Sequence, residues 1–287
     1  MKDEEFIESF ENKVKKTISD YDLISARDKV IVACSGGKDS TAVLYLLKKF
    51  GYDVEALTID LSIGEWSRIN LGNLRKFCKN YNVKLHVANI RDEFGYSIDD
   101  IRSAIQSKTR LKNCTICGVI KRGILNRKAR ALGGTKIATG HNLDDEAQTV
   151  FMNMMKGNPK LGLGLGPKSG VMSDEKFVQR IKPLYFMPNH EIKRYTMAMG
   201  FHLLYEPCPC SSAAFRRDIL NALNKLEKDY PHVKRNIVDN FLKMKPVLLD
   251  AYGLKGKAGK LNYCSVCGEP TRNDVCKTCE LFAVLKK

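Results

Sequence analysis

Apolar and polar residues follow two spacings along the chain. Residues 3–19 place apolar side chains three and four positions apart, which predicts an amphipathic helix. From Lys29 onward, short apolar runs at 29–34, 53–60, 84–90 and 135–140 predict strands, and the segments between them show helical patterns. Alternating strands and helices form βαβ units, so the pattern predicts an α/β fold with a doubly wound parallel sheet.

The second half of the chain divides less regularly. A further strand is expected at 180–187, a helix at 189–200 and basic helices at 212–243. The composition shifts near 245–260, and four cysteines follow closely. We therefore expect three parts: an N-terminal helix at 1–28, a main α/β domain at 29–245 and a small C-terminal module at 246–287.

Charge indicates the class of partner. The 287 residues include 48 Lys and Arg against 32 Asp and Glu, which gives a net charge of +16. An excess of this size favours a polyanionic partner, and nucleic acid is the usual one. No apolar run reaches the length of a membrane span, and the charged N-terminus lacks the apolar core of a signal peptide. We expect a cytoplasmic protein that does not interact with membranes.

A strand-to-helix loop, "SGGKDS" at 35–40, carries the most informative motif. It fails the Walker A pattern, because Val32 stands where the first glycine belongs and Asp39 follows Lys38. It also lacks the dinucleotide-binding G-x-G-x-x-G pattern. It matches the SGGxDS pattern of the PP-loop, the pyrophosphate-binding loop of ATP pyrophosphatases. Glycines and a helix N-terminus suit phosphates, and Asp39 suits Mg²⁺ that bridges them.

Eight of the ten cysteines form close pairs, whereas Cys34 and Cys78 stand alone and are expected to be buried. "CTICG" begins a basic helix, where thiolates are stabilised, and fits zinc, a redox pair or an iron–sulfur cluster. The C-terminal C-x₂-C-x₈-C-x₂-C pattern has the ligands of a structural Zn²⁺ site. The four pairs are Cys114/Cys117, Cys208/Cys210, Cys264/Cys267 and Cys276/Cys279.

A third motif, "TGHNLDDEAQT" at 139–149, follows the fourth expected strand. Asn142 or Asp144 is suited to cap the next helix, and acidic residues are common in a first turn because of the helix dipole. Adjacent carboxylates beside a phosphate-binding loop also suit Mg²⁺ or substrate activation. The residues alone leave both interpretations open.

Together, the loop, the "TGHNLDDEAQTV" segment and the cysteine pairs resemble the tRNA 2-thiolation enzymes of the PP-loop superfamily, whose fold is that of the adenine nucleotide alpha hydrolases. The resemblance extends from Lys29 to Leu281. It implies an enzyme that adenylates a tRNA base with ATP and Mg²⁺ and then replaces the base oxygen by sulfur, with release of AMP and pyrophosphate. It also implies a 4Fe-4S cluster held by the C-x-x-C pair and a distant Cys-Pro cysteine, with one iron left open.

Site residues follow from the resemblance position by position. "EPCPCSS" contains the Cys-Pro step at Cys208, and Cys210 is an addition that offers an alternative third ligand. Zinc in place of the cluster stays open. The implied catalytic residues are Asp39, Lys121, Asp145, Cys114, Cys117 and Cys208. The implied ATP site comprises Ala33, Ser35, Gly36, Gly37, Lys38, Asp39, Ser40, Thr41, Ile59, Asp60, Gly140 and His141.

The substrate position is the least determined feature. The C-terminal zinc module favours uridine over cytidine 32, and the wobble uridine 34 is the first expectation, with uridine 54 of the T-loop as the alternative. Another PP-loop tRNA-modifying enzyme and a non-enzymatic zinc-bearing RNA-binding protein are the competing functions. Expected partners are tRNA and a sulfur donor, which is free sulfide, a ubiquitin-like thiocarboxylate protein or a persulfide. A homodimer stays open.

Overall fold

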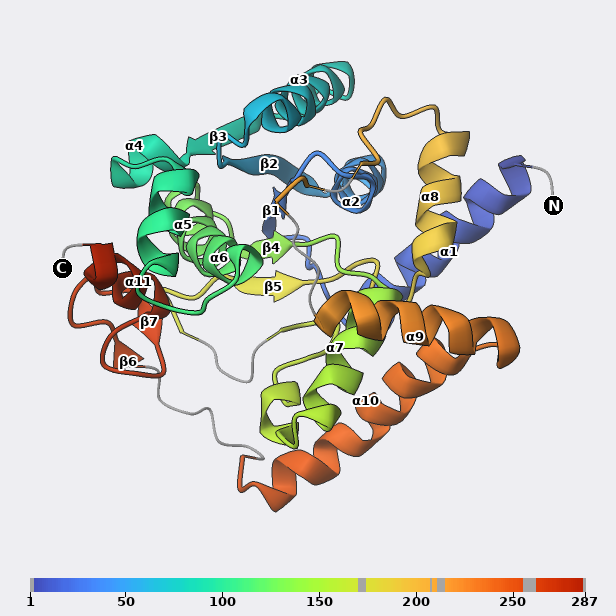
Figure 1. The fold of residues 1–287 in the computed structure, drawn as a ribbon. Coiled ribbons are helices and arrows are strands. Elements are labelled where there is room, and N and C mark those ends of the chain that lie inside the picture. Colours follow the sequence, from blue (N-terminus) through green and yellow to red (C-terminus); the bar gives the residue numbers. More distant parts are fainter. Residues whose placement is uncertain (1–2, 170–173, 207, 211–214, 255–261, 286–287) are drawn as a thin grey trace.

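The computed structural model describes residues 3–169, 174–206, 208–210, 215–254 and 262–285. Its centre is a five-stranded parallel sheet with the strand order β3-β2-β1-β4-β5, so the predicted doubly wound sheet is confirmed (Figure 1). The order reverses between β1 and β4, and such a switch point opens a crevice at the carboxyl ends of the strands. The strands are β1 (Lys29–Ala33), β2 (Asp53–Asp60), β3 (Leu85–Asn89), β4 (Lys136–Ala138) and β5 (Gln179–Ile181).

Helices cover both faces of the sheet because alternate strand residues point to opposite sides. Val30 and Val32 face one core, and Ile31 faces the other. The first core is covered by α1 (Asp3–Asp20), α2 (Lys38–Lys49), α3 (Gly64–Asn80) and α8 (Asn189–Ala198). The second is covered by α4 (Ile90–Phe94), α5 (Ile98–Gln106), α6 (Asn113–Ala131) and α11 (Lys277–Leu285).

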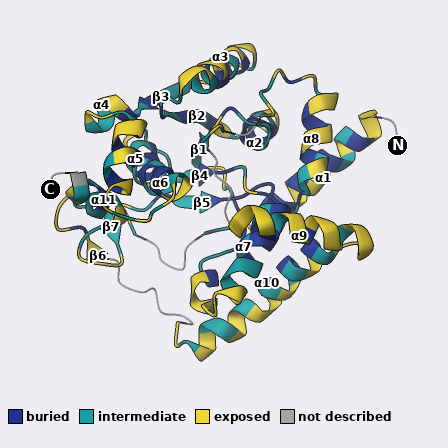
Figure 2. Ribbon diagram, viewed as in Figure 1, coloured by how far each residue is buried: buried dark blue, intermediate teal, exposed yellow. Residues whose placement is uncertain are grey.

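The N-terminal helix packs into the main domain instead of forming a separate part. Its buried stripe faces the protein (Figure 2), and the ring of Phe10 stacks on Tyr195 of α8 with centroids 4.4 Å apart. The hydroxyl of Tyr195 donates a 2.8 Å hydrogen bond to Glu11. The expected division at residue 28 therefore does not separate two cores.

A third cluster of apolar residues joins α7 (Leu143–Met155), α9 (Phe215–Asp229) and α10 (Val233–Ala251) beside the sheet. A short 3-10 helix, Pro159–Gly162, follows α7. Because α10 continues through Pro246 to Ala251, the expected boundary at 245 falls inside a helix. The strand expected at 180–187 ends at Ile181, since Pro183 lacks the N–H that a strand interior needs.

The C-terminal module consists of a two-stranded hairpin followed by α11. Strands β6 (Asn262–Tyr263) and β7 (Pro270–Thr271) pair antiparallel. The module packs on α5 and α6 through α11, in which Leu281 is buried, and Phe282 stacks on Phe94 of α4 with centroids 4.2 Å apart. Gly123 of α6 permits this approach, because a Cβ there would lie 2.7 Å from Oγ1 of Thr278.

Candidate functional site

The loop after β1 wraps the start of α2. Gly36 adopts a φ of +82°, and a Cβ on it would lie 2.9 Å from Oδ1 of Asn70. Glycine therefore meets both a backbone and a steric requirement at this position. Gly37 is the N-cap of α2, and within the described chain no side chain caps it. The first N–H groups of α2 are thus available to an anion, as at other phosphate-binding helix starts.

Serine hydroxyls fix the shape of this loop. The Ser35 N–H donates to Oγ of Ser40 at 3.1 Å, and that hydroxyl donates to the carbonyl of Gly37 at 3.1 Å. Lys38 folds onto its neighbour, with 2.7 Å between its Nζ and the Asp39 carboxylate. Burial raises the pKa of Asp39, Lys38 opposes that shift, and the negative charge of Asp145 adds to it. A carboxylate destabilised in this way favours a divalent cation as a partner.

The loop after β4 lies directly against the loop after β1. A Cβ on Gly140 would lie 2.7 Å from the backbone nitrogen of Ser40, so only glycine permits this contact. Nδ2 of Asn142 donates to Oδ1 of Asp39 at 3.2 Å, while its own Oδ1 caps α7 by accepting from the N–H groups of Asp144 and Asp145. The capping interpretation of this motif is therefore correct for Asn142, and the same residue also joins the two loops.

The three acids that open α7 have different partners. Asp144 forms a buried ion pair with Lys234, and Glu146 forms another with Lys182 at 2.6 Å. Asp145 is less buried: it completes the capping box and lies 3.4 Å from Arg216. It is also a charged neighbour of Asp39. Two of the acids thus have structural ion pairs, and Asp145 is the one that faces the loops.

A cavity of about 190 Å³ continues from the loop along the carboxyl end of β2. Five of the predicted site residues line it, together with Trp66 and Asn70 of α3, which the sequence analysis did not single out. Asp60 is held by Ser62 N–H at 2.7 Å and by the Asn89 amide at 3.2 Å. The five predicted residues are Ala33, Ser35, Ile59, Asp60 and Lys121.

His141 occupies a different position from those five residues. It is exposed, outside the described lining of this cavity, and its Nδ1 lies 2.9 Å from Oγ1 of Thr139. Although the residue is exposed, desolvation by the surrounding protein lowers the pKa of His141, and the charge of Asp145 opposes that shift. The positive charges of Lys182, Arg216 and Arg180 lower it further. The ring therefore lies in a strongly basic part of the site.

The first cysteine pair lies at the start of α6, as expected. Cys114 is exposed and Cys117 is buried. Arg102 of α5 donates from Nη2 to the Cys117 sulfur at 2.9 Å and from Nη1 to Asp99 at 3.1 Å. The Arg102 side chain is only 6% exposed, and its Nε is buried without a hydrogen-bond partner in the described structure.

The second pair lies against the same arginine. Burial would lower the pKa of Arg102, but hydrogen bonds to the sulfurs of Cys117 and Cys210 keep it raised. Burial raises the pKa of Cys208. The Cys210 N–H, which donates a hydrogen bond to the Cys208 sulfur, and the nearby positive charge of Lys121 both oppose that rise. Cysteines from two distant segments and two cations therefore meet at one place.

These thiols do not form a closed metal site by themselves. Among the described residues, only the four C-terminal cysteines have all their ligand atoms within 4.8 Å of one another. The buried, unpartnered Nε of Arg102 and the nearby ammonium of Lys121 suit a group that is anionic and rich in hydrogen-bond acceptors. The residues present therefore fit a cluster with sulfide ligands at this place.

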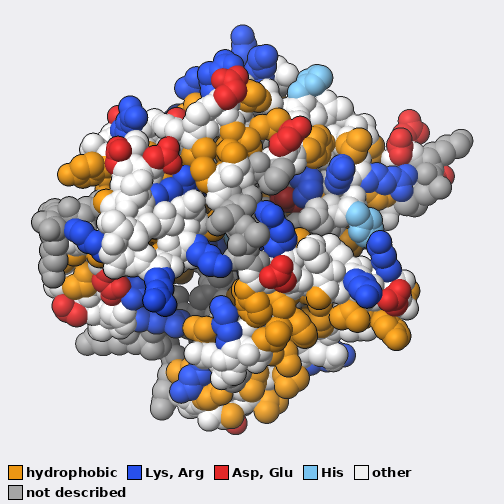
Figure 3. Space-filling view, viewed as in Figure 1, with side chains coloured by type: hydrophobic (Ala, Val, Ile, Leu, Met, Phe, Trp, Pro, Cys, Tyr) orange, Lys and Arg blue, Asp and Glu red, His pale blue; other side chains and the backbone are white. Residues whose placement is uncertain are grey.

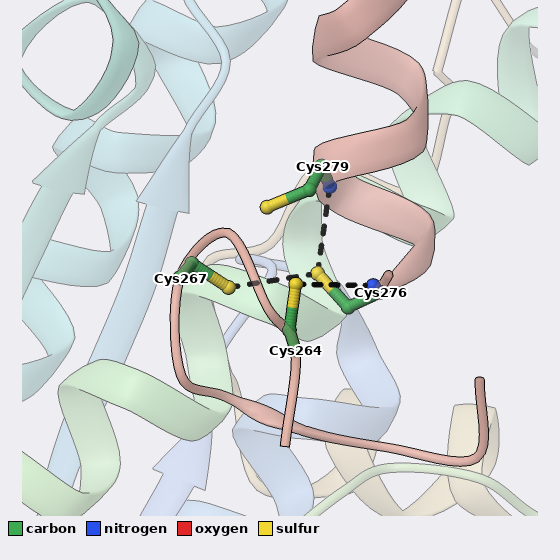
Figure 4. Close-up of side chains that lie close together, drawn as sticks. All are labelled: Cys264, Cys267, Cys276 and Cys279. Carbon is green, nitrogen blue, oxygen red and sulfur yellow. Dashed lines mark hydrogen bonds between the residues drawn. The ribbon is translucent and has the colours of Figure 1, made fainter. Parts of the chain in front are cut away.

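The C-terminal cysteines form a compact tetrad (Figure 4). The sulfurs of Cys267 and Cys276 are 3.7 Å apart, and the Cys276 N–H donates to the Cys264 sulfur at 3.2 Å. Burial opposes ionisation of Cys264, but the N–H groups of Cys276, Cys267 and Val266 lower its pKa to about 6. Four cysteine sulfurs at this separation suit a tetrahedral Zn²⁺ ion.

Several functional side chains carried no local signal in the sequence. Arg102 is one basic residue on an ordinary amphipathic helix, and only the fold brings it to Cys117. Asn70 and Trp66 likewise reach the cavity because α3 packs over β2. Cys34 and Cys78, expected to be buried, are 4% and 2% exposed. No described helix combines the length and apolar character that crossing a bilayer requires.

Comparisons with known proteins agree with this site. A family model for the PP-loop domain matches residues 6–225. A tRNA-5-methyluridine(54) 2-sulfurtransferase of Pyrococcus horikoshii is 35% identical, over 99% of this chain and 88% of that protein. The tRNA 2-thiolation protein NcsA of Haloferax volcanii is 30% identical, over 98% of this chain and 91% of that protein.

A solved structure extends the similarity to the fold. The U34-tRNA thiolase NcsA from Methanococcus maripaludis, with its 4Fe-4S cluster, superimposes with a TM-score of 0.81 at 30% identity. The match covers 99% of this chain and 89% of that one. The family model spans the loop described above, and the solved structure shares the fold. The chain therefore belongs to the PP-loop family of tRNA 2-thiolation proteins.

Proposed function

We propose that this protein is an ATP-dependent tRNA-uridine 2-sulfurtransferase that forms 2-thiouridine. One observation carries the proposal: the cavity that Ser35 of the PP-loop lines is also lined by Lys121. Lys121 lies four residues after Cys117 on α6, so the two side chains share one face of the helix. A nucleotide held by the loop and sulfur held by the cysteines would thus meet at one helix face.

The first half of the reaction would use the loops after β1 and β4. The N–H groups that open α2, with Ser35 and Ser40, bind the phosphates of ATP, and Asp39 and Asp145 bind Mg²⁺. The uridine O2 attacks the α-phosphorus, pyrophosphate leaves, and the base carries AMP on O2. Lys121 offers a positive charge in the lining of the cavity, where it would stabilise the negative charge that develops on the α-phosphate.

The second half would use the cysteine site. We propose that Cys114, Cys117 and Cys208 hold a 4Fe-4S cluster, with Cys210 as the alternative third ligand. Such a cluster supplies an iron with an open coordination position that can carry sulfur. Arg102 holds the Cys117 sulfur in place from its buried position. Sulfur bonds to C2 of the base, and AMP leaves with the original oxygen.

Two substrate positions have specific support. The structural neighbour with a TM-score of 0.81 is a U34-tRNA thiolase, which favours the wobble uridine 34. The relative that is 35% identical is named for 5-methyluridine 54, which favours that position as a second candidate. We propose a cytoplasmic location, since related proteins bear the name cytoplasmic tRNA 2-thiolation protein 1. The sulfur donor and a homodimer remain predictions.

An anaerobic thiolation assay tests the proposal. Reconstituted protein, ATP, sulfide and unmodified tRNA should give 2-thiouridine, which nucleoside mass spectrometry detects and fragment mapping assigns to position 34 or 54. Asp39→Asn should abolish the product, because the Mg²⁺-bound phosphates lose a ligand. Asp53→Asn, an exposed carboxylate at the amino end of β2 and outside the lining of this cavity, is the matched control. No product with the wild-type protein on either tRNA position would refute the proposal.

A further inference from the structure

A second cavity lies between the C-terminal module and the main domain. It encloses about 780 Å³ and is lined by residues of α4, α6, β5 and the module. Three of its lining residues, Cys267, Cys276 and Cys279, belong to the C-terminal tetrad, whereas the wall that α6 and β5 form belongs to neither proposed reaction site. Lys and Arg side chains gather around a hollow in the middle of the face shown in Figure 3, between the parts of the molecule that contain α6 and α7.

The acids that line this second cavity either form ion pairs with other residues or make no ion pair with its two remaining arginines. Glu93 binds Arg127 and Lys128, each at 2.5 Å, and Glu269 binds Arg130. Asp92, the remaining acid on the wall, is exposed and forms no ion pair with Arg122 or Arg180 in the described structure. Those two arginines also line the groove. Arg122 and Arg180 are therefore the positive charges of the second cavity that no described acid neutralises.

Arg180 is the more unusual of the two. Its side chain leaves β5 toward α6, where Nη2 donates to the backbone carbonyl of Arg122 at 3.4 Å. Its Nε is buried and, within the described residues, has no hydrogen-bond partner. Burial, followed by the nearby charge of Arg122, lowers its pKa to about 10. Because this Nε is buried without a partner among the described residues, an anion that accepts its hydrogen bond would remove a desolvation cost.

Arg122 connects this place to the reaction site. A Cβ on Gly118 would lie 3.1 Å from Nη1 of Arg122, so the guanidinium folds back along α6 toward the Cys114–Cys117 turn. The preceding residue, Lys121, lines the nucleotide cavity, and neither arginine is among the described lining of that cavity. The charge of Arg180 also reaches His141. The two arginines therefore lie beside the reaction site without sharing the nucleotide cavity.

We propose that Arg122 and Arg180 form a binding site for one backbone phosphate of the tRNA, next to the nucleotide that is thiolated. Guanidinium groups are the preferred partners of phosphate because their N–H donors match its oxygens. The net charge of +16 favours a polyanion over a single small anion. The inference rests on the proposed function, because it takes tRNA as the substrate.

The salt dependence of tRNA binding tests this site. We would measure the dissociation constant of the reconstituted protein for tRNA at several salt concentrations, for wild type, Arg122→Gln, Arg180→Gln and Arg68→Gln. The last variant removes one arginine from an exposed pair with Glu65 and controls for net charge. Each of the first two should weaken binding roughly tenfold and reduce the salt slope by about one, as the loss of one phosphate contact does. Arg68→Gln should leave the slope unchanged.

Two further measurements separate the alternatives. ATP and inorganic pyrophosphate should bind the variants as they bind wild type; weaker binding of either would assign the arginines to the nucleotide and overturn the proposal. Arg180→Gln should unfold at the same or a higher temperature, because it removes a buried N–H donor that has no partner in the described structure. A lower unfolding temperature with an unchanged tRNA slope would make Arg180 structural and would also overturn it.

The proposal fails separately from the proposed function. If wild-type protein forms 2-thiouridine and all three variants share one salt slope, the phosphate site is refuted and the sulfurtransferase stands. If the variants lose affinity for an acidic protein sulfur donor and keep it for tRNA, the site belongs to a protein partner and the proposal is wrong. If wild-type protein neither binds nor thiolates tRNA, the proposed function fails with it.

Discussion

The two cysteine sites of this protein are built in opposite ways. The C-terminal tetrad draws on one short segment, residues 264–279, and its ligand atoms all lie within 4.8 Å of one another. The other site draws on α5, α6 and residues 208–210, and it leaves a buried arginine nitrogen unpartnered. A site that only has to hold its metal is complete in itself. A site that has to bind and release something retains groups that the protein alone does not satisfy.

Substituting one cysteine in each site should give the largest difference in metal content and activity between variants. Cys117→Ala should abolish thiolation, because it removes a proposed cluster ligand, and should leave bound zinc unchanged. Cys276→Ala should instead lose the bound zinc and keep the visible absorbance of the cluster. Metal analysis and nucleoside mass spectrometry measure both. Cys78→Ala, a buried cysteine outside both sites, is the control, and loss of zinc from Cys117→Ala would contradict the separation.

Removing zinc with a chelator should unfold the module and spare the main domain. Structural zinc contributes its binding free energy to folding, so the hairpin and α11 should lose protection when the metal leaves. Hydrogen exchange should then rise sharply at 262–285 and stay unchanged in α2, whose apolar residues lie in the main core. ATP binding should persist. Simultaneous loss of protection in both regions would mean that the module and the domain form one cooperative unit.

Arg102 tests how far the open site depends on its surroundings. Arg102→Gln removes the donor to the Cys117 sulfur and should lower cluster retention roughly 10–100-fold, the range for groups that orient metal ligands. Iron content during exposure to a chelator measures this, and a shifted reduction potential is an independent readout. Asp99→Asn, which alters only the exposed partner of Arg102, should change retention little. Equal effects of both variants would indicate a general loss of packing.

The smallest effect is expected where the module docks on the domain. Phe282→Ala removes the ring that stacks on Phe94 and should reduce the stability of the docked module by about 1–2 kcal/mol. Val266→Ala, on the same module but 69% exposed, should change it by less than about 0.5 kcal/mol. Urea unfolding followed by hydrogen exchange at α11 separates the two. Similar losses from both variants would contradict the docking described for Phe282.

The sequence predicted what depends on local pattern. The four strands at 29–34, 53–60, 84–90 and 135–140, the PP-loop and the grouping of the four C-terminal cysteines all follow from short-range spacing, because periodicity and ligand geometry act over a few residues. The end of β5 was missed because one proline outweighs an apolar run. Residue 245, where a boundary was expected, lies inside α10 because that helix accommodates Pro246.

Contacts between distant segments were beyond such patterns. Arg102 reaches Cys117 from fifteen positions away, and Asn142 reaches Asp39 from 103 positions away. Arg180 meets Arg122 only because β5 lies beneath α6. None of these residues differs locally from a surface arginine or a helix cap. Their roles come from burial and from the partners they lack, which exist only in the folded chain.

The most direct test of the central claim is the ratio of AMP formed to 2-thiouridine formed in one anaerobic reaction. Joint use of the PP-loop cavity and the cysteine site predicts one AMP for each 2-thiouridine with the wild-type protein. It also predicts no 2-thiouridine from Cys117→Ala, even when ATP and tRNA are bound. Formation of 2-thiouridine by Cys117→Ala, or by wild-type protein without AMP, would contradict the account.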